Sequence, residues 1–209
     1  MAGLAAAAAG SPPPSLTASE EHCKFCFDVL VAKLQGRALP EATFANRSLK
    51  APLFVTWTTT REDALRGCIG NFSDLELGSG IRDYALVAAL EDSRFQPVSL
   101  SEVPGLSVGV SLLVNFENGR DARDWEIGKH GIRISFSNPS NGRTCGATFL
   151  PEVAKEQGWT VDETLTALVR KAGYRGSLSE SLIASIKLVR YQSSKARLSY
   201  EAYQQAKTA

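Results

Sequence analysis

Hydrophobic and polar residues alternate along two stretches in the middle of the chain. Every second residue is apolar over 106–114 and again over 132–136. An alternation of this period places the apolar side chains on one face of a strand, so both stretches predict half-buried strands. The apolar runs at 52–57 and 65–72, joined by a polar connection, predict a hairpin.

Two further strands are expected towards the C-terminus. The segment Asn-Pro-Ser-Asn-Gly at 138–142 is typical of a turn and predicts a partner strand near 143–149. A last alternating stretch near 186–191 predicts a returning strand.

Helical spacing of apolar residues predicts two helices in the first half of the chain. The first begins at a capping box formed by Thr17 and Glu20 and ends at Gly36. The second begins after Ser79 and runs to about Glu91.

Helix signals are denser in the C-terminal third. Pro151 suits the first turn of a short helix because it has no N–H group to leave unpaired there. Two more capping boxes, Thr160 with Glu163 and Ser177 with Glu180, predict further helices. The C-terminal third is therefore expected to be mostly helical.

The order of these elements indicates the fold class. Strands and helices do not alternate as regular βαβ units, which favours an α+β fold with antiparallel sheet. The 209 residues, 44% of them hydrophobic, can bury one sizeable core or two small ones that share a cleft. The Ala/Pro-rich segment 1–17 is expected to be a disordered extension, and no apolar run is long enough to predict a membrane span.

Cysteine and histidine usage limits the chemistry that is expected. Four cysteines are too few and too unevenly spaced for a disulfide framework, which favours a reducing compartment, the cytoplasm or the nucleus. Cys23 and Cys26 form a C-x-x-C pair, but both lie on the apolar stripe of the first helix, so core packing is preferred to zinc binding. With two histidines in the chain, neither a metal site nor a cofactor is expected.

The net charge of +1 is distributed unevenly. Residues 1–169 carry an excess of five acidic side chains, whereas residues 170–209 carry an excess of six basic ones. Such a basic segment can bind nucleic acid, or it can pair with the acidic remainder of the chain. The second interpretation is preferred, because no nucleic-acid motif accompanies the charge.

The segment Leu-Arg-Gly-Cys-Ile-Gly at 65–70 is the most unusual local sequence. On a strand, Arg66, Cys68 and Gly70 would point to one face and the residues between them to the other. Glycines within a strand mark a bulge or a close approach of a ligand or backbone. An arginine beside a thiol favours the reactive thiolate. Cys68 is therefore a candidate nucleophile or ligand contact, and the alternative is a small side chain buried in a tight sheet.

The hexapeptide 65–70 resembles the signature of the AMMECR-one protein family. Other family segments follow in the expected order over about residues 20–205: PLFVTW at 52–57, the spaced pattern Asp92, Arg94, Phe95 and Pro97, VSLL at 110–113, GKHGI at 128–132, ATFLPEVA at 147–154, GWT at 158–160, LVRKAGY at 168–174 and RYQ at 190–192.

This resemblance implies a single domain over 18–205 built of two unequal α+β subdomains. Each subdomain would have an antiparallel sheet and flanking helices, the larger being built from both chain ends, with the signature beside the cleft between them. The family has no firmly established activity. Some prokaryotic relatives are joined to, or encoded beside, Memo-like and radical-SAM proteins, which implies a functional link with these partners.

His130 is a candidate general base for Cys68, because an adjacent imidazole can take the proton of a nucleophile. Glu152 or Glu156 could orient this imidazole in a Cys-His dyad. The glycines on both sides of His130 also suit an ordinary turn between strands.

Three catalytic candidates result, namely Cys68, Arg66 and His130, together with five candidate cleft residues: Gly67, Gly70, Arg94, Glu152 and Lys171. The preferred hypothesis is a cysteine-dependent enzyme, or enzyme accessory, acting on a small anionic or carbonyl substrate in the cleft. The alternative is a non-catalytic regulatory module that binds a protein or a metabolite. Association with nucleic acid through the basic C-terminal segment ranks below both, and no membrane partner is expected.

Overall fold

The computed structural model describes residues 15–208, which form six helices, a short 3-10 turn η1 (Val103–Gly105) and six strands. The strands are β1 (Lys50–Thr59), β2 (Leu65–Glu76), β3 (Leu106–Asn118), β4 (Gly131–Ser137), β5 (Thr144–Phe149) and β6 (Lys187–Ser199). The helices are α1 (Glu20–Leu34), α2 (Leu77–Leu90), α3 (Pro151–Glu156), α4 (Val161–Lys171), α5 (Glu180–Ser185) and α6 (Tyr200–Thr208).

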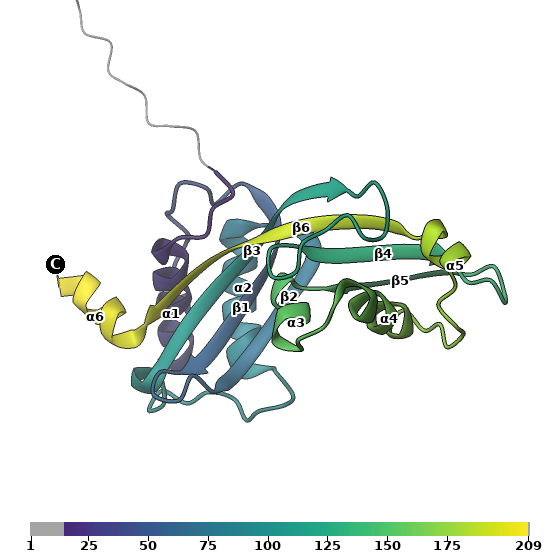
Figure 1. The fold of residues 1–209 in the computed structure, drawn as a ribbon. Helices are drawn as coiled ribbons and strands as arrows, with labels where there is room; N and C mark the ends of the chain where they lie inside the picture. The colour runs from purple at the N-terminus through teal and green to yellow at the C-terminus, as the bar shows by residue number, and fades with distance from the viewer. Residues whose placement is uncertain (1–14, 209) are drawn as a thin grey trace, which may run out of the picture.

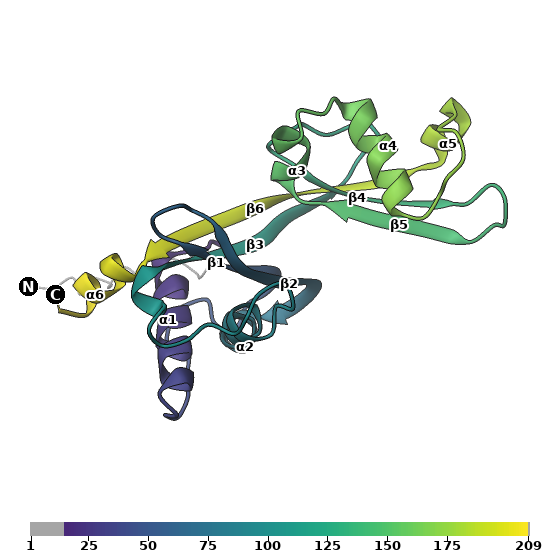
Figure 2. The same ribbon diagram turned by 90° about the horizontal axis from the view of Figure 1, so that it is seen from below.

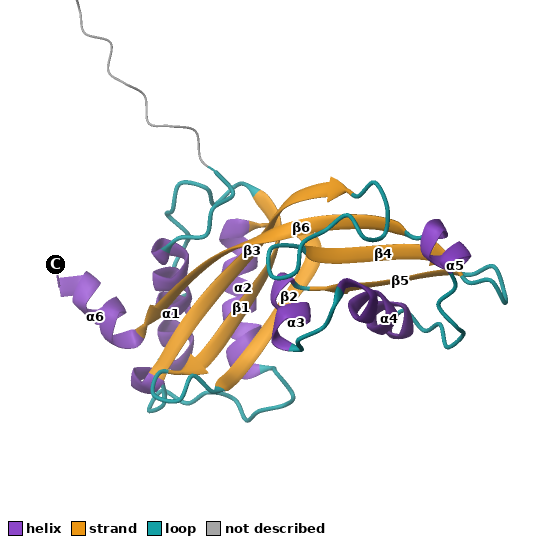
Figure 3. Cartoon of the chain, in the orientation of Figure 1, coloured by secondary structure: helices purple, strands orange, loops and turns teal. Residues whose placement is uncertain are grey.

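All six strands belong to one antiparallel sheet in the order β2-β1-β3-β6-β4-β5 (Figures 1 and 3). This confirms the predicted α+β class with antiparallel pairing. The strands beside the two groups of helices are joined into a continuous sheet, because β3 pairs with β6 along most of its length.

Two hydrophobic cores lie along this sheet. The larger core packs α1, α2 and α6 against β1 and β3, and its largest fully buried side chains include Phe27, Trp57 and Tyr203. The smaller core packs α4 and α5 against β4 and contains Ile134 and Leu168. The two ends of the described chain meet in the larger core, where the rings of Phe27 and Tyr203 stack 4.9 Å apart.

The sheet twists between the two cores. Figure 2 shows α1 and α2 on one side of the sheet and α3, α4 and α5 on the other. Leu188 and Leu198 are an even number of residues apart on β6, yet they pack in different cores. A right-handed twist accumulated along a long strand explains this. The sheet face opposite α1 and α2 is therefore on the same side of the sheet as α3, next to the smaller core.

The capping box of Thr160 with Glu163 is confirmed at the start of α4. The other two predicted boxes are wrong by two residues, because Ser19 caps α1 and Ser179 caps α5. At α1 the cause is tertiary: the Asn46 side chain donates to the carbonyl oxygen of Ser15 at 2.8 Å and to that of Thr17 at 3.3 Å. These bonds hold the preceding segment outside the helix.

The start of α2 lies at Leu77, earlier than the predicted start after Ser79. The N–H groups of Leu77 and Gly78 donate to the carbonyl oxygens of Leu49 and Arg47, which satisfies the first turn from outside the helix. Of the predicted extension 1–17, residues 1–14 lie outside the described part of the chain.

The expectation of a mostly helical C-terminal third is corrected by β6. Its predicted portion near 186–191 continues to Ser199, and the added residues pair with β3 from Ser107 to Val114. The segment 192–197 is polar except for Ala196, so its apolar pattern is weak. Pairing with a neighbouring strand determines its conformation.

The C-x-x-C pair packs in the core, as predicted. Cys23 and Cys26 are fully buried on α1, and burial raises the pKa of the Cys23 thiol to about 12. Within residues 15–208, no helix combines the length and the apolar character that crossing a bilayer requires.

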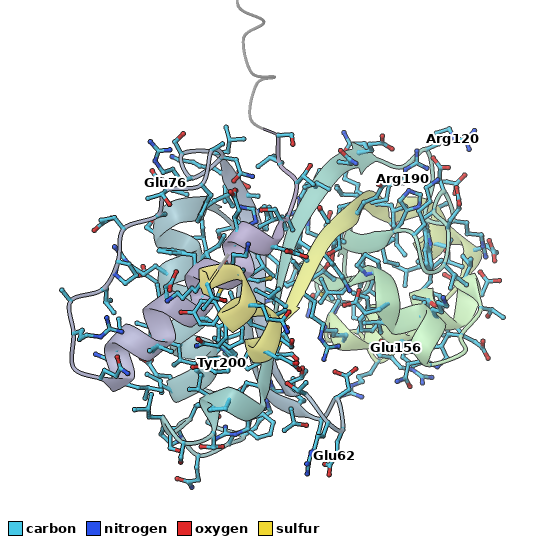
Figure 4. All side chains as sticks on the ribbon, turned by 90° about the vertical axis from the view of Figure 1, so that its left-hand side faces the viewer. Glu62, Glu76, Arg120, Glu156, Arg190 and Tyr200 are labelled. Atoms are coloured by element: carbon cyan, nitrogen blue, oxygen red, sulfur yellow. The ribbon has the colours of Figure 1, made fainter. Side chains whose placement is uncertain are left out.

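The basic C-terminal segment pairs with the acidic remainder of the chain. Four of its cations form ion pairs with carboxylates from residues 1–169: Arg190 with Glu117 and Asp124, Lys195 with Glu152, Arg197 with Asp63, and Lys207 with Asp28. Figure 4 shows Arg190 beside Arg120, which also pairs with Asp124. These contacts support the structural interpretation of the charge asymmetry over a nucleic-acid surface.

We expect the stability of the fold to decrease in mild acid. His22 is fully buried, its Nδ1 accepts the Ser19 N–H at 2.9 Å and its Nε2 lies 2.8 Å from Asn46 Oδ1. Burial lowers the pKa of His22 below the ordinary value of 6.5, and it also lowers that of His130. Below about pH 6.5 the unfolded chain therefore binds more protons than the folded chain. The free energy of unfolding decreases as the pH is lowered through this range.

Urea denaturation between about pH 7.5 and pH 5 measures this dependence. His22→Gln should have a smaller pH slope than the wild type, even though it is less stable overall. Equal slopes in the two proteins would show that His22 does not contribute.

Candidate functional site

The signature strand β2 lies at the edge of the sheet beside β1. Its register pairs Gly67 with Trp57, Cys68 with Thr56 and Gly70 with Phe54. Gly67 is buried against α2, whereas Cys68 is half-buried on the opposite face. The alternation predicted for Gly67 and Cys68 is therefore present.

Both glycines of the signature allow close packing. A Cβ at Gly67 would overlap the carbonyl oxygen of Ala88 in α2, and one at Gly70 would overlap the ring of Phe54. The adjacent Trp57 indole donates to the Ala85 carbonyl at 3.0 Å. The two glycines thus let α2 approach the sheet on one side and an aromatic ring cover it on the other.

An ion pair forms hydrogen bonds with the backbone at the outer edge of β2. The Cys68 N–H donates to Asp92 Oδ2 at 2.9 Å, and Arg94 Nη2 donates to the Cys68 carbonyl at 3.1 Å. Arg94 Nη2 lies 2.7 Å from Asp92 Oδ2. Hydrogen bonds from Arg94 hold the pKa of the Asp92 carboxyl far below its usual range. This pair takes the place of a neighbouring strand and fixes the backbone at Cys68.

Arg66 is held in the same region. Its Nε donates to Glu102 Oε1 at 3.0 Å, while its Nη1 is enclosed and has no hydrogen-bond partner within residues 15–208. The guanidinium carbons of Arg66 and Arg94 lie 5.9 Å and 5.5 Å from the centre of the Phe95 ring. These distances are typical of cation–π contacts, which stabilise the loop that follows α2.

The Cys68 thiol lies on what we call the open face, the side of β1, β2, β3 and β6 opposite α1 and α2. Its hydrogen-bond partner is the Thr56 hydroxyl, 3.1 Å from Sγ. Strand register aligns two adjacent rows of residues across this face: Cys68, Thr56, Gly109 and Arg197 in one, and Gly70, Phe54, Ser111 and Lys195 in the next.

The second row ends at a groove of about 580 Å³. Three segments line it: 128–129 before β4, 151–156 in α3 and 192–195 in β6. In Figure 4, Glu156 of α3 stands on the side of the smaller core that faces the larger one. We call this cavity the α3 groove.

The α3 groove contains incompletely paired polar atoms. Glu152 Oε1 pairs with Lys195 Nζ at 3.1 Å. Glu152 Oε2 and the Ser193 hydroxyl are both enclosed and have no hydrogen-bond partner among the described residues. Leaving such groups unpaired costs about 1–3 kcal/mol each, so a partner that reached them would be stabilised.

Gly128 positions the Lys155 side chain in the groove. Its φ of +79° favours glycine, and a Cβ there would lie 3.2 Å from Lys155 Cδ. The absence of a side chain at Gly128 therefore lets the stem of Lys155 lie across the backbone.

The structure does not bring His130 to Cys68. β4, which follows His130, is four strand positions from β2 in the sheet, or about 19 Å at the usual spacing. The Nδ1 of His130 accepts a hydrogen bond from the Glu126 N–H at 3.0 Å, so the imidazole stabilises the turn at 126–130. The predicted Cys-His dyad is not assembled in this arrangement.

Lys171 is also remote from the signature. Its ammonium donates to the Thr148 carbonyl at 2.9 Å and lies 4.8 Å from the centre of the Phe149 ring. Lys171 therefore connects α4 to β5. Of the other predicted residues, Arg66, Gly67, Gly70 and Arg94 surround Cys68, whereas Glu152 lies in the α3 groove.

Sequence reasoning missed Lys155, Ser193 and Lys195 as groove residues. A usable signal existed, because three of the segments that resemble family motifs contribute to the α3 groove: GKHGI at 128–132, ATFLPEVA at 147–154 and RYQ at 190–192. Within residues 15–208, no group of three or more His, Cys, Asp or Glu side chains is arranged to hold a metal ion.

The packing role of Gly67 can be tested by substitution. Gly67→Ala should destabilise the fold by about 3 kcal/mol, because the new methyl group overlaps the Ala88 carbonyl. Gly105→Ala is the matched control, since a Cβ there meets no atom within 4 Å. Denaturant unfolding of both variants measures the difference, and equal stabilities would contradict the close approach of α2.

Comparison with known proteins agrees with this fold. The protein PH0010 of Pyrococcus horikoshii, a solved structure, superposes with a TM-score of 0.68 at 24% identity, covering 88% of this chain and 94% of its own. The protein At2g38710 of Arabidopsis thaliana is 42% identical over 191 residues, or 90% of this chain and 88% of its own length. YOR289W of Saccharomyces cerevisiae is 39% identical, covering 74% of this chain and 70% of its own. The AMMECR1 family model matches residues 23–196, and the chain belongs to the AMMECR1 family.

Proposed function

We propose that this protein binds a small anionic or carbonyl compound on the open face, between Cys68 on β2 and the α3 groove. The observation that carries the proposal is the strand register. It places Cys68 and Lys195 on the same face of the sheet, in adjacent rows and three strand positions apart, or about 14 Å. A small ligand therefore contacts both only when it lies between them, over β1 and β3.

The chemistry of the open face suits an anion. Lys155 contributes a cation at the groove that makes no ion pair among the described residues. Lys195 and Arg197 end the two rows, and each would exchange its ion pair with Glu152 or Asp63 for the ligand.

Between these cations and Cys68 the floor is low at Gly109, which has no side chain, and at Ser111, whereas Phe54 covers the part of the second row at Gly70. A compact ligand could thus lie flat on the sheet while its acidic groups contact the lysines.

Binding is favoured over catalysis by the surroundings of Cys68. Activation of a nucleophile by general-base catalysis needs a base within hydrogen-bond reach. Among residues 15–208, the group hydrogen-bonded to the Cys68 thiol is the Thr56 hydroxyl, which is not a base at neutral pH. Recognition without turnover, as in a regulatory module, is therefore the first function that we assign to this surface.

A cysteine-dependent reaction is the second candidate, and it rests on exposure. Cys68 is half-buried on the open face, whereas Cys23 and Cys26 are fully buried. A thiol at this position could add to a ligand carbonyl, forming a carbon–sulfur bond while the thiol proton passes to the carbonyl oxygen. The reaction would be reversible and would need no further reactant.

Site-resolved alkylation tests the shared surface. Iodoacetamide should label Cys68 more than about tenfold faster than Cys23 or Cys26, because labelling of a buried thiol requires opening of the core. Glutarate, a small dianion, at about 10 mM should slow the labelling of Cys68 but not that of Cys145 on β5. Mass spectrometry separates the four thiols. Labelling of Cys68 that is unchanged by small anions would contradict the proposal.

Charge variants on one strand provide a second test. Lys195→Gln should weaken the protection of Cys68 by glutarate about tenfold, because it removes a cation from the groove. Lys187→Gln is the matched control, since Lys187 is exposed at the opposite end of β6. Equal protection in the two variants would place the anion elsewhere.

A further inference from the structure

We propose that the α3 groove recognises an acidic amino acid, a compound with one ammonium group and two acidic groups. This inference rests on the proposed function and names the ligand class of the same cleft. It follows from the mixture of lysines and glutamates at the groove. A simple anion would pair with the lysines and leave the glutamates without a partner.

The charges that line the groove determine the charge of the complementary ligand. Three lysines, Lys129, Lys155 and Lys195, stand among two carboxylates, Glu152 and Glu156. Lys129 is paired with Glu126 outside the groove, so the charges left for a ligand are those of Lys155, Lys195 and the two carboxylates, which balance. Such a mixed lining favours a ligand that carries both signs, and one with two acidic groups and one ammonium offers a partner to each of Lys155, Lys195 and Glu152.

The ammonium subsite is at Glu152 and Ser193. One carboxylate oxygen of Glu152 pairs with Lys195, while Oε2 and the Ser193 hydroxyl are enclosed without hydrogen-bond partners within the described chain. An ammonium has three donors and can serve both carboxylate oxygens and a hydroxyl. The Glu152 side chain is about one-third exposed, so it can turn towards a ligand in the groove. Lys195 would then be released to pair with an acidic group of that ligand.

The acidic groups of the ligand would meet Lys155 and Lys195. Lys155 makes no ion pair within residues 15–208, and its stem is held across Gly128. Lys129, by contrast, is already 3.0 Å from Glu126 Oε1. Lys155 is therefore the cation that is free to bind an acid, and its position is fixed by a glycine whose φ is positive.

Three segments that resemble family motifs meet at the α3 groove, which supports its assignment as a binding site. The segments GKHGI and ATFLPEVA supply Gly128 and Glu152, and Gln192 comes from RYQ. These three segments are distant from one another in the chain, and none of them lies beside the signature strand β2. A shared role in the groove accounts for their lying together.

Isothermal titration calorimetry with three probes tests the inference on the full chain. L-Glutamate carries the ammonium and both acids, glutarate lacks the ammonium, and L-glutamine lacks one acid. L-Glutamate should bind at least about tenfold more tightly than either of the others. Glu152→Gln should remove the preference for L-glutamate over glutarate. Glu201→Gln, an exposed carboxylate on α6, should retain it.

The outcomes separate the two proposals. If glutarate binds as tightly as L-glutamate, the groove is a plain anion site, so the inference fails and the proposed function stands. If none of the probes binds up to about 10 mM and none protects Cys68 from alkylation, both fail. Should Glu152→Gln not fold, Ser193→Ala removes the second partner of the ammonium, and an unchanged preference in that variant would overturn the inference.

Discussion

The pairing of β3 with β6 is the interaction on which the rest of the structure depends. Each strand has thirteen residues and extends for roughly 44 Å, and the pairing runs from Ser107 to Asn118, so it reaches both hydrophobic cores. Leu198 at one end packs in the core that contains Phe27 of α1 and Tyr203 of α6, whereas Leu188 at the other end packs in the core that contains Leu182 and Ile183 of α5. Without this pair the sheet would separate into a part beside α1 and α2 and a part beside α4. The twist of the same pair also exposes the open face beside α3.

The candidate site follows from the same constraint. Because the rows of residues cross four hydrogen-bonded strands, the position of Cys68 relative to Lys195 is fixed by backbone pairing. The edge of β2 is held by Asp92 and Arg94, so the signature strand is rigid on its outer side as well. Such a surface is prepared for a ligand before the ligand arrives, which reduces the entropy lost on binding. This arrangement favours recognition by a preformed face.

Much of the fold could be predicted from local patterns, and the site could be predicted in part. Alternation identified 106–114 and 132–136 as strands, because one side of each is buried. The second half of β6 escaped prediction, since polar residues lie on both of its faces and its conformation depends on β3. The signature strand was recognisable as a contiguous segment. The α3 groove was not, because Glu152 and Lys195 meet only through the twist of the sheet.

The most direct test of the open face as the binding site is a titration of isotope-labelled protein with L-glutamate, followed by amide chemical shifts. We expect the shifts to concentrate at Gln192, Ser193 and Lys195 and to extend along the rows to Thr56 and Cys68. The amides of α6 and of the β4–β5 turn should remain unchanged. Shifts confined to those distant segments, with none on the open face, would contradict the central claim.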